Sequence, residues 1–429
     1  MSATTSLPTP ARRLLGDALL VARGTVFGQA PFVLVMPLIT RLYPPAQVGI
    51  YGLALAFVGL AAPVAGLRFE LAAISARDAD DSRALLLLSG LAIVPVTALC
   101  AALLYVLKVM RLGAYDALPW SIVAATVATV AASGAYSTLR CWLVRRYRFP
   151  LVATSLTVQG WVRASVPVLF APLGASAGLL MGGELIARLS AVALMLQQSG
   201  AHRALRALRI PARALYERAA RFWKYPLLLG PSALIDAAAT ALPVPVLASY
   251  YGLADAGKFA LVQRLVMLPA ALIAGSVGDV FHAHAADIAG REPGATAGFL
   301  ATTAARLLWF AAAVYVPVAL LAPLGAGWLF GRQWADAGPM IAALAPLCIA
   351  QTVVSPISRG LLLSGREELK LLADLACLVL PITTLYLASG QRMIVAVACF
   401  SAASVLAFLI YYLVIVRALR SPATAGLRR

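Results

Sequence analysis

The sequence is poor in charge and in the side chains that soluble enzymes use for catalysis. Charged residues make up 12% of its 429 positions, about half the share of a typical soluble domain. There are three histidines and 17 acidic residues, and the five cysteines have no CxxC spacing. No GxxxxGK[ST] segment is present to bind a nucleotide. We therefore expect a protein that is not an enzyme, with no metal site and no cofactor.

Apolar residues dominate the composition. Hydrophobic residues account for 62% of the chain and the mean hydropathy is +0.88, against roughly 45–50% hydrophobic residues in soluble proteins. A soluble fold of this size must cover its surface with polar groups, which are too few here. The composition excludes a soluble enzyme, a disordered chain and a disulfide scaffold. It predicts an integral membrane protein. The N-terminus lacks a short apolar region that ends in a small-residue cleavage site before the first long span, so we expect no cleavable signal peptide.

About twelve stretches are long and apolar enough to cross a bilayer, which takes about 20 residues of helix. They predict an all-α integral membrane protein with twelve transmembrane helices. The stretches span residues 18–40, 48–67, 84–107, 118–141, 151–171, 176–196, 226–248, 256–278, 303–324, 338–362, 369–388 and 393–416.

Basic residues give the orientation of these spans. The formal net charge is +18, which in a soluble protein would suggest nucleic acid, but we expect no nucleic-acid partner here. With the N-terminus in the cytoplasm, most Lys and Arg residues fall in cytoplasmic segments, as the positive-inside rule requires. We expect a bacterial inner (plasma) membrane protein with both termini cytoplasmic. The basic segment 202–224 is interpreted as a topology signal, or alternatively as a docking strip for anionic lipids or a cytoplasmic partner.

An internal repeat divides the chain. Residues 43–54 read YPPAQVGIYGLA and residues 251–262 read YGLADAGKFALV. At a constant spacing of 208 positions, Tyr43 matches Tyr251 and Gly49 matches Gly257. Each segment follows the first helix of a six-helix half. The repeat predicts two lobes, residues 1–210 and 211–429, related by a pseudo-two-fold axis along the membrane normal. Such lobes can rock around a central cavity, as alternating access requires.

Three segments of the chain resemble one family. Residues 38–71 contain a Leu-Tyr-x-Pro turn, a Gly-x-Tyr and the sequence Arg68-Phe69-Glu70. This region is similar to the opening of the polysaccharide transporter family, which belongs to the multidrug/oligosaccharidyl-lipid/polysaccharide exporter superfamily. Residues 222–261 resemble the start of that family's second half, and residues 329–366 resemble its tenth helix.

The resemblance implies a function. Members of this family include flippases that move a polyprenyl-diphosphate-linked oligosaccharide from the cytoplasmic to the outer leaflet, for O-antigen (lipopolysaccharide), capsule or exopolysaccharide synthesis. We expect the lipid-linked oligosaccharide and membrane lipids as partners, with polysaccharide polymerase and glycosyltransferases as further candidates, and a monomeric protein. A proton gradient, a sodium gradient or the membrane potential would supply the energy.

Arginines inside apolar spans are the first candidate site residues, because a charge at membrane depth is costly unless it faces water or a partner. A guanidinium donates paired hydrogen bonds to phosphate oxygens and stays charged when partly desolvated. We predict that Arg23 and Arg264 bind the diphosphate, and the resemblance also favours cations on the first and eighth helices. The alternative for both is internal pairing or snorkelling to the interface.

Two further pairs have helical i, i+4 spacing. Gln159 and Arg163 share one helix face, which predicts either a cavity surface that contacts the sugar or hydrogen bonding between helices. Glu184 and Arg188 have the favoured acid-first order for a structural ion pair, and coupling or gating is their alternative role.

Other charged residues suit coupling or gating. Asp236 lies midway along an apolar span and is predicted to couple transport to protons or sodium, or to pair with an Arg such as Arg264. Arg68 and Glu70 at the inner end of the second helix predict a cytoplasmic gate or a salt-bridge cluster. Asp374 is expected to be structural.

Three rival functions remain open. A cation- or proton-coupled drug exporter of the same superfamily would favour acidic groups in the cavity, whereas Arg outnumbers acid within the spans of the first half. A membrane glycosyltransferase or polymerase would need a catalytic carboxylate at a membrane face and long external loops. A scaffold that recruits synthesis enzymes would depend on the segment 202–224.

Overall fold

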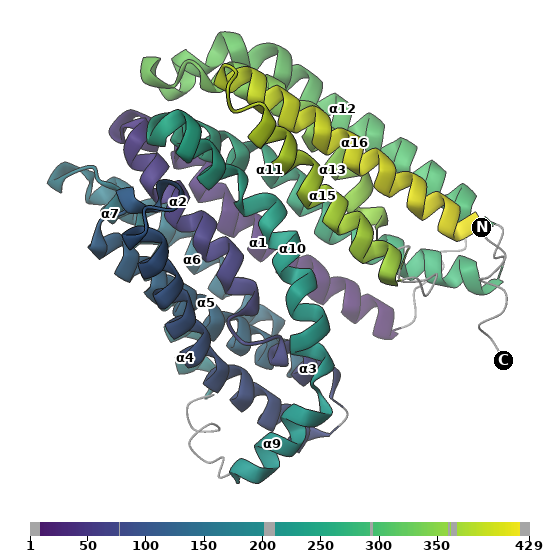
Figure 1. Cartoon of the computed structure of the whole chain (residues 1–429). Helices are drawn as coiled ribbons and strands as arrows, with labels where there is room; N and C mark the ends of the chain where they lie inside the picture. Colours follow the sequence, from purple (N-terminus) through teal and green to yellow (C-terminus); the bar gives the residue numbers. More distant parts are fainter. Residues whose placement is uncertain are drawn as a thin grey trace. The chain divides into compact units, whose positions relative to one another are not determined.

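The computed structural model describes residues 9–76, 78–200, 211–291, 295–358, 361 and 367–420. Within them every regular element is a helix, which confirms the all-α class (Figure 1). Part of the basic segment 202–224 lies outside these residues, including Arg203, Arg206 and Arg209.

Ten segments among the described residues are long and apolar enough to cross a membrane. One of them, Tyr225–Ala270, covers two of the predicted spans. The helix Phe149–Leu169 falls on a further predicted span but is not among the ten. Its hydropathy is lowered by Gln159, Arg163 and several hydroxyl side chains. The chain is a multi-pass membrane protein, and the layout of twelve helices in two lobes stays a prediction.

The chain divides into two compact units. Unit 1 comprises residues Met1–Leu42, Phe57–Met110 and Leu118–Leu234, and unit 2 comprises Tyr43–Ala56, Arg111–Ala117 and Ile235–Arg429. The predicted lobe boundary between residues 210 and 211 stays a prediction.

Unit 1 contains α1 (Thr9–Leu42), the end of α2 (Pro45–Ala61), η1 (Ala62–Val64), α3 (Phe69–Ser75), α4 (Ala79–Val109), α5 (Trp120–Arg145), α6 (Phe149–Leu169), η3 (Ala171–Leu173), α7 (Ala177–Ser199), α9 (Ala212–Arg221) and η4 (Tyr225–Leu229). Small residues bring α1 and α6 together. A Cβ at Gly28 or Gly160 would overlap backbone atoms of the other helix, and Gly24 lies against Ala153. This is the close packing that small residues four apart permit between membrane helices.

Unit 2 contains the start of α2, η2 (Gly113–Ala117), most of α10 (Gly230–Ala241), α11 (Pro243–Arg291), α12 (Ala295–Phe330), η5 (Arg332–Trp334), α13 (Ala337–Ile357), α15 (Glu367–Leu387) and α16 (Met393–Arg420). A buried apolar cluster joins α12, α13, α15 and α16, with Leu300, Ile357, Leu361 and Ile415 at its centre.

The internal repeat recurs as a break in the helices. In the first copy, α1 ends at Leu42 and α2 begins at Pro45. In the second copy, α11 is interrupted at Gly252, whose φ of 82° is left-handed and favours glycine. Because Gly252 lies 208 positions after Pro44, both copies change direction at matched residues.

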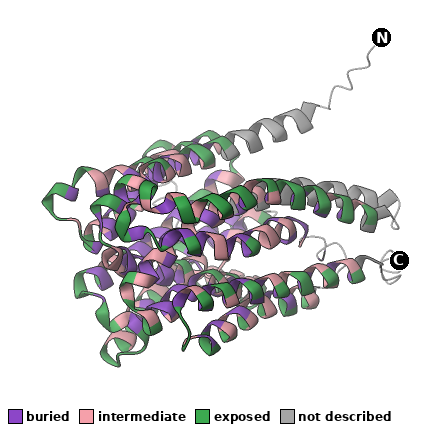
Figure 2. Cartoon of the chain, turned by 90° about the horizontal axis from the view of Figure 1, so that it is seen from above, coloured by how far each residue is buried: buried purple, intermediate pink, exposed green. Residues whose placement is uncertain are grey.

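Large apolar side chains remain exposed along the long helices, where buried and exposed residues alternate (Figure 2). On α12, Trp309, Leu320, Leu324 and Trp328 are each 70% exposed or more. Exposed apolar surface of this extent is unfavourable in water but is suited to contact with lipid chains.

Candidate functional site

A cluster of charged side chains joins α6 and α7 inside unit 1. Glu184 of α7 is 2% exposed and pairs with two guanidiniums. Its Oε2 lies 2.9 Å from Arg163 Nε of α6, and its Oε1 lies 3.3 Å from Arg188 Nε of its own helix. The predicted Glu184–Arg188 ion pair is confirmed. Arg163 also pairs between helices, which was the alternative to its role in contacting the sugar.

Gln159 completes this cluster. With its amide oxygen turned toward the guanidiniums, it accepts hydrogen bonds from Arg188 Nε at 3.1 Å and from Arg163 Nη2 at 3.3 Å. The four residues form the α6–α7 charge cluster, with two cations, one anion and a net charge of +1. Their side chains are largely buried, and only Arg163 (12%) and Arg188 (23%) retain some exposure. The cluster therefore favours an anion over a cation.

Arg68 ends a strained turn after α2, and Glu70 lies in the first turn of α3 that follows. The motif was expected at the end of the second helix, but α2 ends at Ala61, before Pro63. Leu67 and Arg68 have left-handed φ values of 51° and 60°, and α3 starts at Phe69. Proline and two left-handed residues are incompatible with a continuous helix.

Glu70 is buried at the start of α3, where Ser89 Oγ of α4 donates to its Oε2 at 3.2 Å. Burial raises the pKa of the Glu70 carboxyl, although its backbone hydrogen bond, the Arg68 charge and the Ser89 hydroxyl lower it in part. The carboxyl therefore takes up a proton at a higher pH than an exposed Glu does. Arg68 Nε is buried and has no hydrogen-bond partner among the described residues.

The end of the basic segment 202–224 is engaged in ion pairs. Arg218 Nε and Arg221 Nη1 of α9 lie 2.9 and 3.1 Å from the two carboxylate oxygens of Asp81 on α4. Arg213 pairs with Glu217 within α9. Arg218 and Arg221 thus hold α9 against α4 inside unit 1. These ion pairs do not distinguish a topology signal from a docking strip for anionic lipids or a cytoplasmic partner.

The two arginines predicted to bind the diphosphate differ in environment. Arg23 of α1 is exposed. Arg264 of α11 is half-buried, and its Nη1 donates to the Tyr51 hydroxyl of α2 at 2.9 Å. Tyr51 was not among the predicted site residues, since 213 positions separate it from Arg264. Whether either arginine contacts a substrate stays a prediction.

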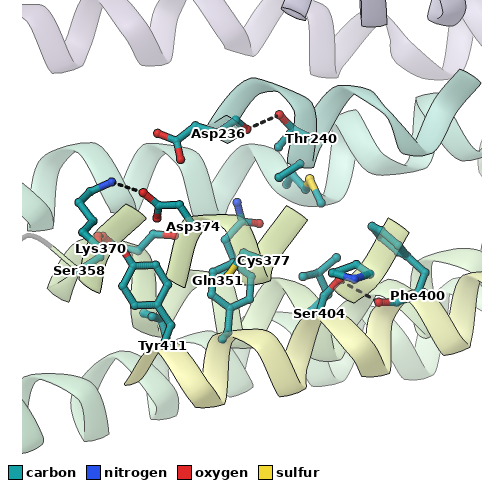
Figure 3. A pocket seen from close by; sticks show the side chains of 17 residues that line it. Asp236, Thr240, Gln351, Ser358, Lys370, Asp374, Cys377, Phe400, Ser404 and Tyr411 are labelled. Carbon is teal, nitrogen blue, oxygen red and sulfur yellow. Dashed lines mark hydrogen bonds and ion pairs between the residues drawn. The ribbon is translucent and has the colours of Figure 1, made fainter. Parts of the chain in front are cut away.

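A pocket of about 320 Å³ lies within unit 2. Asp236 projects into it from α10, and Asp374 and Lys370 project from α15 (Figure 3). Lys370 donates to Asp374, which is 8% exposed. The structural role expected of Asp374 stays a prediction. The pocket is also lined by the polar residues Thr240, Gln351, Ser355, Ser358, Ser404 and Tyr411.

Among the described residues that line the pocket, two are carboxylates, Asp236 and Asp374, and one is an ammonium, Lys370. Gln351 Oε1 on α13 is buried without a hydrogen-bond partner in the described part of the chain. An acidic, hydroxyl-lined hollow suits a proton or a small cation. Sequence reasoning identified Asp236 but missed Lys370 and Gln351. The i, i+4 spacing of Lys370 and Asp374 could have indicated their pairing.

Comparison with known protein families gives one match. Residues 17–281, more than half of the chain, match the family described as polysaccharide biosynthesis protein. The matched range contains Arg23, Arg163, Arg188 and Arg264. Among curated protein sequences, no match was found.

Solved transporter structures share the fold. The "Lipid II flippase MurJ, inward closed conformation" superposes with a TM-score of 0.70 at 12% identity, covering 96% of this chain and 87% of that one. An inward-facing multidrug resistance MATE transporter of the MOP superfamily gives 0.59 at 14%, with 95% and 96% covered. A MOP superfamily transporter from Pyrococcus furiosus, described by a reversed polarity of its binding pocket, gives 0.56 at 12%, with 94% and 96% covered.

Proposed function

The chain belongs to the polysaccharide biosynthesis protein family, and from this premise we propose that it flips a polyprenyl-diphosphate-linked oligosaccharide across the bacterial inner membrane. The observation that carries the proposal is the family match over residues 17–281, which contains four arginines within predicted apolar spans. The likeness of the fold to a lipid II flippase supports the same substrate class.

In this proposal the substrate enters from the cytoplasmic leaflet. Arg23 and Arg264 bind the diphosphate, because guanidinium groups match phosphate oxygens and remain charged in an apolar setting. The sugar occupies a polar interior that includes Gln159 and Arg163, and the polyprenyl tail stays in lipid. The lobes then rock, with both termini remaining cytoplasmic. The protein acts as a monomer in the synthesis of O-antigen, capsule or exopolysaccharide, alongside polymerase and glycosyltransferases.

Replacing both Arg23 and Arg264 with Ala is expected to reduce export of surface polysaccharide at least roughly tenfold. Each lost hydrogen bond to a charged group weakens binding by about that factor. The measurement is surface glycan per cell at equal protein level, in cells that lack the chromosomal copy. Arg213→Ala serves as the control, since Arg213 is 90% exposed and pairs within α9. Unchanged export in the double variant would remove both residues from the mechanism.

The acidic pocket of unit 2 is proposed to couple transport to a proton or sodium gradient. Asp236→Asn keeps the shape of the side chain but removes the charge and the titrating proton. We expect export to fall, and the remaining export to lose its response to an imposed proton or sodium gradient. Asp80→Asn is the matched control, because Asp80 is 78% exposed outside the pocket. If export by Asp236→Asn keeps its full response to the imposed gradient, then other residues couple transport to the gradient, or the membrane potential drives it.

We propose a gating role for two further pairs of charged residues, Arg68 with Glu70 and Glu184 with Arg188. The Arg68–Glu70 turn stores left-handed strain and a buried carboxyl, both of which a rearrangement would relieve. Glu184 and Arg188 would hold α7 in place while α6 contacts the substrate.

Drug export is the second candidate function, because the fold is also shared with a multidrug resistance transporter. Two arginines against one acid in the α6–α7 charge cluster favour an anionic substrate instead. A strain lacking the gene would distinguish the two. Accumulation of lipid-linked sugar on the cytoplasmic leaflet indicates a flippase, whereas sensitivity to cationic drugs with normal surface glycan indicates an exporter. A membrane glycosyltransferase would instead leave the lipid-linked sugar unmade.

A further inference from the structure

The two copies of the internal repeat contact each other within unit 2. A Cβ at Gly49 of α2 would overlap the carbonyl oxygen of Leu253 on α11, and a Cβ at Gly257 would overlap the carbonyl oxygen of Pro45. Gly49 and Gly257 are matched positions, and so are Pro45 and Leu253. The contact is therefore reciprocal, as between two-fold-related helices. We name it the repeat crossing, formed by residues 45–52 and 253–260.

Matched positions also meet further along the repeat crossing. A Cβ at Gly52 would lie 2.8 Å from the Cβ of Ala260, and these residues again differ by 208 positions. The backbones are thus held close over about one helical turn.

The symmetry fails at a polar contact between the two helices. Arg264 Nη1 donates to the Tyr51 hydroxyl at 2.9 Å, and Tyr51 is 7% exposed. The matched positions are Ala56 for Arg264 and Phe259 for Tyr51. Phe259 packs its ring edge-on against Phe400, with 6.2 Å between the ring centroids. An aromatic ring thus fits this position of the crossing without a hydroxyl, so packing alone does not account for the hydroxyl of Tyr51.

We propose that Tyr51 is a positioning residue that fixes the guanidinium of Arg264 for binding a diphosphate. This inference rests on the proposed function, in which Arg264 binds that group. A guanidinium recognises phosphate through its planar fork, and its long side chain loses rotamer freedom on binding. A hydrogen bond from Nη1 to a buried hydroxyl holds the plane of the fork before the substrate arrives, which lowers the entropy cost of binding.

The test is the binding of farnesyl diphosphate to the purified, full-length protein in lipid nanodiscs. Tyr51→Phe removes only the hydroxyl and is expected to raise the Kd roughly tenfold, while thermal unfolding stays near that of the wild type. Tyr105→Phe is the control and should leave the Kd unchanged, because Tyr105 is 56% exposed and contacts Trp120 instead. Tyr51→His retains a ring with an acceptor nitrogen and should keep most of the affinity.

A double-mutant cycle separates positioning from packing. If Tyr51 acts through Arg264, Tyr51→Phe adds no further loss in an Arg264→Ala background. An equal loss in both backgrounds, or wild-type affinity in Tyr51→Phe, overturns the inference. If Arg264→Ala lowers affinity while Tyr51→Phe does not, the binding role of Arg264 stands and only the inference fails. If Arg264→Ala also leaves the Kd unchanged, the proposed role of Arg264 itself fails.

Discussion

Replacing Glu184 with Gln is expected to destabilise the protein by about 3–5 kcal/mol, the usual cost of removing one partner from a buried ion pair. Arg163 and Arg188 would remain close together with 12% and 23% exposure and no carboxylate between them. A neutral amide cannot compensate two guanidiniums in an apolar environment. The measurement is thermal or denaturant unfolding of the purified protein in lipid nanodiscs.

Two companion variants identify the cause. Arg188→Gln keeps the 2.9 Å pair of Arg163 with Glu184 and should cost much less. The double variant Glu184→Gln/Arg188→Gln leaves one cation, as in the net charge of the wild type, and should recover part of the stability lost in Glu184→Gln. A Glu184→Gln protein that unfolds like the wild type would show that the guanidiniums reach water or lipid headgroups.

Gly160→Ala should cost about 1–3 kcal/mol by forcing α1 away from α6, the range for overpacking a tight interface. The added carbon would overlap the carbonyl oxygen of Gly28, which is backbone and cannot rotate away. Both helices would have to shift, and the contact between Gly24 and Ala153 would loosen with them. The loss should appear as a lower unfolding midpoint in the same nanodisc assay.

Gly182→Ala on α7 is the matched control. Apart from its own stretch of helix, no atom of the described residues lies within 4 Å of the position its Cβ would take. Alanine has a higher helix propensity than glycine, so this variant should be neutral or slightly more stable. If both variants behave alike, close packing at Gly160 does not stabilise the α1–α6 contact.

The all-α class and the positions of most of the apolar spans were predictable from sequence. Length and hydropathy are local properties, and a helix in lipid must satisfy its backbone hydrogen bonds within itself. The Glu184–Arg188 pair was predictable for the same reason, because four residues separate its partners along one helix. Asp236 was found because a charge within an apolar run is conspicuous.

Contacts between helices could not be predicted from local sequence patterns. Arg163 meets Glu184 only because α6 packs against α7, and their spacing in sequence carries no signal. The pocket around Asp236 depends on side chains from five helices, α10, α11, α13, α15 and α16. The repeat revealed that Gly49 and Gly257 correspond, but not that these two residues touch.

The repeat crossing has an evolutionary consequence. A reciprocal contact is what a homodimer makes, where a mutation in one gene alters both sides of the interface at once. Fusion of two copies into one polypeptide frees each side to vary alone. Tyr51 and Arg264 are joined by a hydrogen bond, whereas the matched positions hold Phe259 and Ala56, which cannot form one. A dimer of two identical chains would carry the same residues on both sides and could not make this difference.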